Sequence, residues 1–82
     1  MSDIRVTTEQ VDAILAESTV EAVKLGEKTT VVAVTLPCGF VIVTSSSCID
    51  PKNYSHSLGT SLCLKRAADR LWELEGYRVQ SF

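Results

Sequence analysis

The sequence predicts an α+β fold in which a helix, an antiparallel β-hairpin and a long helix follow one another in the order α-β-β-α. Three observations predict it: a helix-capping pattern near the start, two β-branched runs on either side of a Pro-Cys-Gly turn, and a long apolar stripe of helical period after an Asp-Pro pair. The chain has 82 residues, enough for one domain and too few for two, so residues 1–82 are expected to form a single domain.

The first helix is predicted to begin after Thr7. Thr7 and Gln10 fit the capping box, in which the threonine hydroxyl and the glutamine amide each satisfy a backbone group that lacks an intrahelical partner. Apolar residues then share one face of this helix, at Val11, Ile14 and Leu15. Ser18 and Thr19 weaken or end the helix, and Gly26 is expected to stop it in any case.

The hairpin is predicted from residues 28–36 (KTTVVAVTL) and 40–44 (FVIVT), joined by a turn at residues 37–39. Apolar residues occupy both faces of both strands, so the hairpin needs cover on both faces. Two helices of the same chain could supply that cover, but a second subunit is the simpler source. We therefore expect a homo-oligomer.

The stretch TSSSCIDPKNY, residues 44–54, is predicted to form the corner between the second strand and the last helix. Asp50 as N-cap and Pro51 at the first helical position are typical of a helix start, because proline loses no hydrogen bond there. Ser55 and Ser57 are alternative caps one turn later.

The last helix carries the longest apolar stripe of the chain and is predicted to cover the hairpin. The stripe consists of Leu58, Leu62, Leu64, Ala67, Ala68, Leu71 and Trp72. Trp72 is expected in the core, and Gly59 is expected to permit close packing, which would explain its presence within a helix. Gly76 is predicted to end the helix, and the alternating residues 77–82 could add a short edge strand.

Charge and hydropathy exclude several classes of protein. The net charge is −2 and no stretch is strongly basic, so a protein that follows long nucleic acid is disfavoured. The first residues do not resemble a signal peptide, and the longest apolar run is too short to cross a bilayer, so no membrane association is expected. Cys38, Cys48 and Cys63 are expected to be free thiols of a cytosolic protein, because their spacing fits no zinc or redox pattern.

No catalytic or metal-binding constellation is complete in the sequence. Cys48, Asp50 and His56 lie on one segment and could form a nucleophilic triad or supply metal ligands, but their spacing matches no known pattern of either kind. Neither a P-loop nor a dinucleotide-binding motif is present. We expect a protein that is not an enzyme and that uses no cofactor or metal, with a Cys48/His56 hydrolase as the alternative.

A small-ligand site at the corner agrees better with the sequence than catalysis does. Serine hydroxyls, a lysine and an asparagine can hold a small anion, and a tyrosine can stack on a ring. The predicted ligand-binding residues are Ser45, Ser46, Ser47, Lys52, Asn53, Tyr54 and His56. The plainer interpretation is that the serines only end a strand and solvate a loop. Asp50 also competes, because its carboxylate would occupy the helix end that an anion needs.

Two stretches, LPCGFVIV and CIDPKNYSHSLGTSLCLKRAADRLWELEGY, resemble the phage gene 66 family, small accessory proteins of tailed phages. The resemblance covers about the C-terminal two-thirds of the chain and rests on a hairpin turn, a corner and a helix ending. The matching positions are Leu36, Gly39 and Phe40 in the turn, Cys48, Asp50, Pro51, Asn53 and Tyr54 in the corner, and Leu71, Trp72, Leu74, Glu75, Gly76 and Tyr77 in the helix. The chain has TSSS where the family has small residues and glutamate.

The resemblance implies a phage origin and expression in the host bacterial cytoplasm, and it carries over no catalytic residue. Two hypotheses of different class follow. In the first, a small non-structural accessory protein acts in host takeover or counter-defence as an oligomer that sequesters a small nucleotide-type host immune signal. In the second, the protein blocks a host protein through an apolar surface and binds no small ligand.

Overall fold

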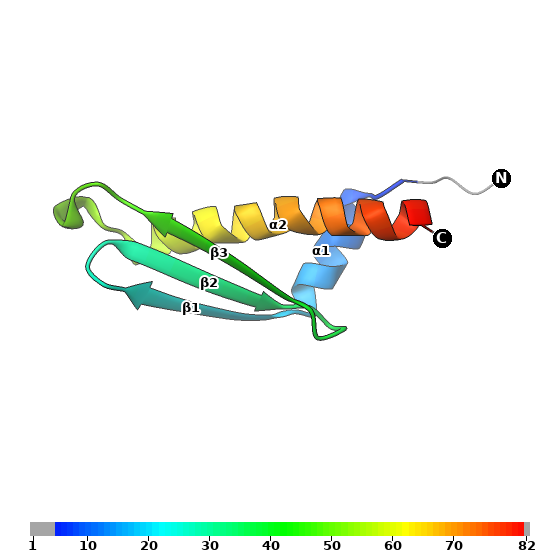
Figure 1. Ribbon diagram of the computed structural model, residues 1–82, viewed down its shortest axis with the longest axis horizontal. Coiled ribbons are helices and arrows are strands. Elements are labelled where there is room, and N and C mark those ends of the chain that lie inside the picture. The colour runs from blue at the N-terminus through cyan, green and yellow to red at the C-terminus, as the bar shows by residue number, and fades with distance from the viewer. Residues whose placement is uncertain (1–4, 82) are drawn as a thin grey trace.

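The computed structural model describes residues 5–81 and has two layers, a three-stranded antiparallel sheet and a long helix across one of its faces (Figure 1). The elements in chain order are α1 (Thr8–Ala16), β1 (Thr19–Leu25), β2 (Thr29–Thr35), β3 (Val41–Ser47), the 3-10 helix η1 (Pro51–Asn53) and α2 (His56–Ser81). The strand order is β1-β2-β3, so β1 and β3 are the two edges. The α+β class and the helix–hairpin–helix order are confirmed, with one strand added to the hairpin.

β1 is the added strand, and the sequence did not predict it. The capping box at Thr7 and Gln10 is present, but α1 ends at Ala16, where the Ser18 hydroxyl donates to the carbonyl of Ile14 at 2.7 Å. The residues that follow, TVEAVKL, pair with β2 over their whole length. Their glutamate, alanine and lysine suit a helix and their valines suit a strand, so pairing with β2 decides the conformation.

Both hairpin turns depend on a glycine with positive φ. Gly26 (φ +69°) lies in the turn between β1 and β2, so its prediction as a helix terminator is wrong. Gly39 (φ +95°) ends the predicted turn between β2 and β3. There the Leu36 N–H donates to the Phe40 carbonyl and the Gly39 N–H donates to the Leu36 carbonyl, both at 2.8 Å. This pattern closes a three-residue loop whose last position favours glycine.

β3 and α2 are both longer than predicted. β3 continues through Ser47, which pairs with Thr29, so the serines belong to the strand and not to the corner. α2 passes through Gly76 to Ser81, so the predicted helix end and the predicted edge strand are both wrong, and Phe82 lies outside the described residues. One interior glycine costs a helix only about 1 kcal/mol, which is too little to end a helix of this length.

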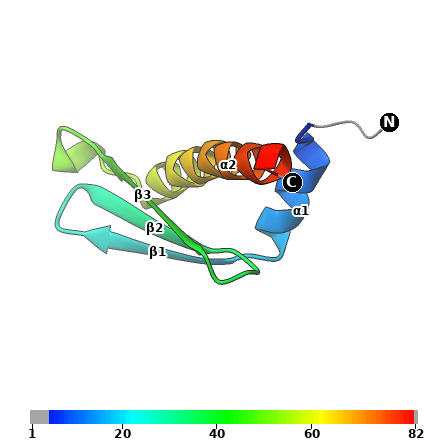
Figure 2. The same cartoon turned by 45° about the vertical axis from the view of Figure 1, so that its right-hand side comes forward.

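α2 packs on the sheet through residues spaced four apart, with the smallest, Gly59, at the start and the largest, Leu71, farthest along. Cys63 and Ala67 complete this buried row. α2 therefore lies close to the sheet near its start and farther from it toward its end (Figure 1). α1 lies beside the later turns of α2, at the wider end (Figure 2), and its Val11 is buried in the same core. The close packing predicted at Gly59 is confirmed, since a Cβ there would lie 2.4 Å from Thr30 Oγ1.

The sheet contributes the other half of the core through one face only. Its buried apolar side chains are Val32, Val34, Leu36 and Ile42. Trp72 is 37% exposed, so its prediction as a core residue is wrong. Leu71 is the last residue of the buried row of α2, and the next position along a helix points about 100° away from that row, toward solvent. The face of the sheet away from α2 has no cover within the described chain, and it exposes apolar side chains, at Val23, Leu25, Val41 and Val43.

Candidate functional site

A hollow of about 100 Å³ lies at the close end of the sheet and α2, beside the corner that joins β3 to α2. The ends of β2 and β3, the corner and the first turns of α2 all line it. Its apolar wall is formed by Leu58 and Leu62. Its polar lining residues are Lys28, Thr30, Ser46, Ser47, Asn53, Tyr54 and Ser55. The hollow exists because Gly59 lets α2 approach β2 here while the corner residues fold back beside both.

The corner is built by Asp50. Its carboxylate accepts from the backbone N–H of Lys52 at 3.0 Å, and its carbonyl accepts from the N–H of Asn53 at 2.9 Å. The Cys48 thiol donates to the same carbonyl at 3.2 Å. Pro51 starts the short helix η1, as an Asp-Pro pair at a helix start predicts. These contacts place Asn53 and Tyr54 at the hollow.

Tyr54 is held by a line of hydrogen bonds. Its hydroxyl lies 2.8 Å from Oγ1 of the fully buried Thr30 and 3.0 Å from Nδ1 of His56. The ammonium of Lys24 lies 4.9 Å from the centre of the Tyr54 ring, within cation–π distance. One side chain from the corner therefore joins β2, β1 and the start of α2, which fixes the ring in place.

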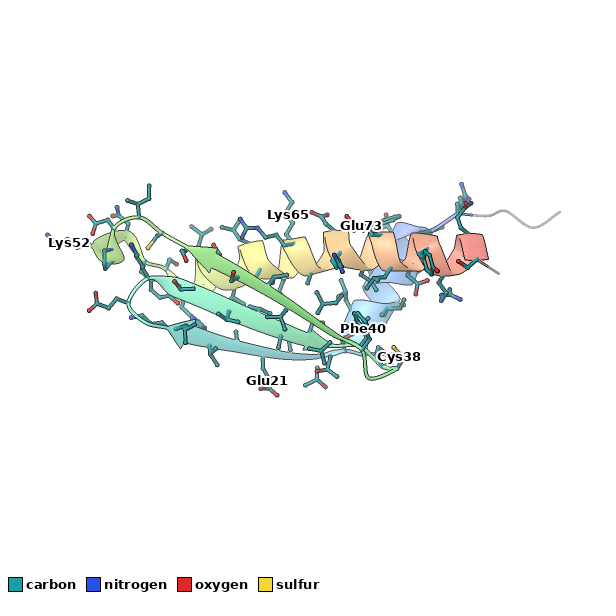
Figure 3. All side chains as sticks on the ribbon, in the orientation of Figure 1. Glu21, Cys38, Phe40, Lys52, Lys65 and Glu73 are labelled. Carbon is teal, nitrogen blue, oxygen red and sulfur yellow. The ribbon has the colours of Figure 1, made fainter. Side chains whose placement is uncertain are left out.

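The structure brings together four of the seven predicted ligand-binding residues, namely Ser46, Ser47, Asn53 and Tyr54. His56 does not line the hollow, and its imidazole bonds to Tyr54, which does. Ser45 lies outside the hollow, and its carbonyl, at the unpaired edge of β3, accepts from Arg66 of α2. Lys52 lies at the tip of the corner with its side chain directed away (Figure 3). Lys52, the one lysine predicted to bind an anion, therefore does not line the hollow.

Lys28 is the cation at the hollow, and the sequence analysis did not name it. It precedes β2, and its ammonium donates to the carbonyl of Ile49 at 3.4 Å, which leaves two of its three N–H groups for other acceptors. Thr30, Leu58 and Leu62 were also missed as site residues. Their only sequence signal was membership of a strand or of an apolar stripe, and the pairing of β2 with β3 brings Lys28 beside Cys48.

Asp50 does not compete for the start of α2. It caps η1, whereas α2 is capped by Ser55, whose hydroxyl accepts from the N–H of Leu58 at 3.2 Å. The objection that a carboxylate would neutralise an anion site therefore does not hold for this geometry. Within residues 5–81, no hydrogen bond engages the Ser46 hydroxyl or the side-chain amide of Asn53, whereas Ser47 Oγ lies 2.8 Å from Thr29 Oγ1. Lys28, Ser46 and Asn53 can thus bind an anion or a polyol beside an apolar wall.

The residues of the conceivable triad take separate roles. The Cys48 thiol donates to a backbone carbonyl, and the His56 imidazole bonds to Tyr54, so the described hydrogen bonds do not join Cys48 to His56. Across residues 5–81, no three histidine, cysteine, aspartate or glutamate side chains gather as they would around a metal ion. Cys38 is exposed in a turn and Cys63 is buried, and both are free, as is Cys48.

The chain matches the model of the phage protein (N4 Gp49/phage Sf6 gene 66) family over residues 6–82. The chain belongs to this family. No curated protein and no solved structure matches it. The match extends the resemblance seen in the C-terminal two-thirds back through α1 and β1, so it covers every helix and strand described above. No helix in the described part of the chain is long and apolar enough to cross a membrane.

Proposed function

We propose that this phage protein is a non-enzymatic binding protein that sequesters a small nucleotide-type host immune signal as part of counter-defence in the host bacterial cytoplasm. The hollow at the corner supports this proposal. It combines a cation at Lys28 and unengaged polar groups at Ser46 and Asn53 with an apolar wall of leucines. A nucleotide needs both kinds of surface, because its phosphate takes charged and polar donors while its base packs against apolar side chains.

The size of the hollow supports an oligomer. Small-molecule sites commonly measure roughly 300–1,000 Å³, so a hollow of about 100 Å³ holds a phosphate or a sugar but not a whole nucleotide. Its rim is apolar and open to solvent: Leu58 is 61% exposed and Leu62 is 40% exposed. A second copy that covers this rim would remove both side chains from water and extend the site. We propose that the ligand is held between subunits.

Native mass spectrometry of protein purified gently from phage-infected bacteria tests this proposal first. An oligomer that carries a small adduct in a fixed ratio supports sequestration, and the adduct mass identifies the ligand class. A bare monomer contradicts both the shared site and the ligand.

Thermal shift against a panel of linear and cyclic nucleotides is the second test, because a ligand that binds only the native state raises its stability. Lys28→Ala is expected to weaken the best ligand by at least about tenfold in Kd, roughly the 1.4 kcal/mol of one lost charged contact. Lys52→Ala is the matched control, since that lysine points away from the hollow. Equal loss in both variants would show that general charge, and not the hollow, holds the ligand.

The second candidate function is inhibition of a host protein through an apolar surface, without a small ligand. The uncovered face of the sheet favours it: Val23 is 53% exposed and Val43 is 63% exposed, and both lie on the face away from α2. Capture of one host protein that is lost in Val23→Lys would support this function. Retention of capture in that variant would exclude this face as the binding surface.

A further inference from the structure

The outer edge of β3 has backbone groups that no strand pairs. β3 is the last strand of the sheet and bonds to β2 on one side only. In an antiparallel pair, residues alternate between those bonded to the partner strand and those whose N–H and C=O groups point the other way. The bonded pairs at the two ends of this ladder are Leu36 with Phe40 and Lys28 with Cys48.

Counting from either end gives the same alternation. Ile42, Thr44 and Ser46 bond to β2, so the residues between them direct their backbone groups to the free edge. Arg66 confirms this orientation, because its guanidinium reaches from α2 to the outward carbonyl of Ser45. Nothing in residues 5–81 bonds to the corresponding outward groups of Val41 and Val43.

A groove of about 380 Å³ runs along this unpaired part of the edge. It is lined by residues 40–44 of the strand and its turn and by Arg70 of α2. Figure 1 shows that α2 and β3 are farther apart at the start of β3 than at its end, and Figure 3 places Phe40 beside that start. Arg70 forms no ion pair or hydrogen bond within the described chain, so its charge is available to a partner.

We propose that the β3 edge at Val41 and Val43 is a docking site for an extended segment of another protein that carries an acidic side chain. An added strand would satisfy the outward N–H and C=O groups, as in β-strand addition to other exposed sheet edges. A carboxylate on the added segment would pair with Arg70 across the groove. An aliphatic side chain two residues away, on the same face of the added strand, would pack on Phe40, which is half exposed.

Charge argues against a second copy of this chain as the occupant. β3 has no acidic residue, so a second β3 strand paired about a two-fold axis would bring no carboxylate of its own to Arg70. The other edge, β1, does carry an acid, Glu21, but Glu21 lies on the face of the sheet away from α2, whereas Arg70 belongs to α2. Pairing of β3 with β1 is also head-to-tail and would give a ring or a filament instead of a two-fold dimer. The inference stands apart from the corner hollow and would hold if no nucleotide bound there.

The test is an NMR titration of the ¹⁵N-labelled protein with the blocked hexapeptide acetyl-Val-Thr-Asp-Thr-Val-Thr-amide, which has valines on the same face as the aspartate, in register variants that move the aspartate along the strand. The expected result is saturable shifts of the Val41, Val43 and Ser45 amides, with the amides of the corner hollow unmoved. Two control peptides should bind at least about tenfold more weakly: one with lysine in place of aspartate, and one with alternate backbone amides N-methylated. Absence of shifts at these amides, or equal binding of the N-methylated peptide, overturns the proposal.

Val43→Pro is the matching protein variant. It removes an outward N–H while the ladder to β2 stays intact, a substitution that edge strands accept. It should abolish peptide binding, whereas Val43→Ala should keep it and Arg70→Glu should transfer preference to the lysine peptide. If Val43→Pro folds and still binds, or if sedimentation shows that this variant dissolves an oligomer of the native chain, another surface or a second copy occupies this role and the proposal fails. The N-methylated peptide decides the matter should the proline variant not fold.

Discussion

The side chain of Thr30 lies directly against the bare backbone of Gly59. A Cβ at Gly59 would lie 2.4 Å from Thr30 Oγ1 and 3.0 Å from Thr30 Cβ, although Thr30 is itself fully buried on β2. The same Thr30 hydroxyl bonds to Tyr54 at the candidate site. One contact therefore sets how closely α2 approaches the sheet and also holds one wall of the hollow.

Gly59→Ala is expected to destabilise the protein although alanine is the better helix former. The added methyl group must displace buried Thr30, and overpacking of this kind costs about 1–3 kcal/mol, more than the roughly 1 kcal/mol that alanine gains in a helix. Gly76→Ala is the control: it lies in the same helix with nothing within 4 Å of a new Cβ, so it should stabilise by up to about 1 kcal/mol. Urea unfolding of both variants measures the difference. Stabilisation by both would show that α2 can move away from β2 without penalty.

Thr→Val substitution should lower the free energy of unfolding at one buried position and not at another. Thr30→Val removes a hydrogen bond to Tyr54 and should cost about 1 kcal/mol. Thr60 Oγ1 is buried without a hydrogen-bond partner among the described residues, so Thr60→Val should be neutral or stabilising by up to about 1 kcal/mol. Thermal unfolding compares the two variants. A loss at Thr60 as large as that at Thr30 would mean that the Thr60 hydroxyl is satisfied in solution.

Thr7→Ala is expected to cost about 1 kcal/mol because it removes one half of the capping box of α1. Its hydroxyl accepts from the Gln10 N–H at 3.2 Å. Thr8→Ala, one residue later and exposed, changes the same side chain without touching a cap and should be close to neutral. Amide hydrogen exchange in α1 should increase in the first variant only, and equal exchange in both would argue that packing of Val11 alone holds the helix.

Val23→Glu should reduce any self-association through the uncovered face of the sheet while leaving the fold intact. Val23 is largely exposed in one chain, so the charge is expected to cost the monomer less than about 0.5 kcal/mol. Val20→Glu places the same charge on the same strand but on the face toward α2, because Val20 pairs with the buried Val34. Sedimentation velocity should show a smaller species for Val23→Glu only. Unchanged sedimentation of that variant would assign association to another surface.

Part of the candidate site was predictable from the sequence and part was not. Asp50, Pro51, Asn53 and Tyr54 are adjacent in sequence and carry strong local preferences, so a corner with polar side chains was predictable. Lys28 was not, because it lies 20 residues before Cys48 and reaches the site only through the register of β2 with β3. Lys52 was predicted in its place because proximity in sequence cannot tell which way a side chain points.

By itself the sequence determined the features that depend on a few neighbouring residues: the capping box, the Pro-Cys-Gly turn, the long amphipathic helix and the close packing at Gly59. The tertiary structure alone decided the state of residues 19–25, the continuation of α2 through Gly76, the exposure of Trp72 and the grouping of Lys28 with Ser46 and Asn53. The reason is energetic. Local preferences differ by about 1 kcal/mol or less per residue, and strand pairing and burial across the core outweigh them wherever the local signals disagree.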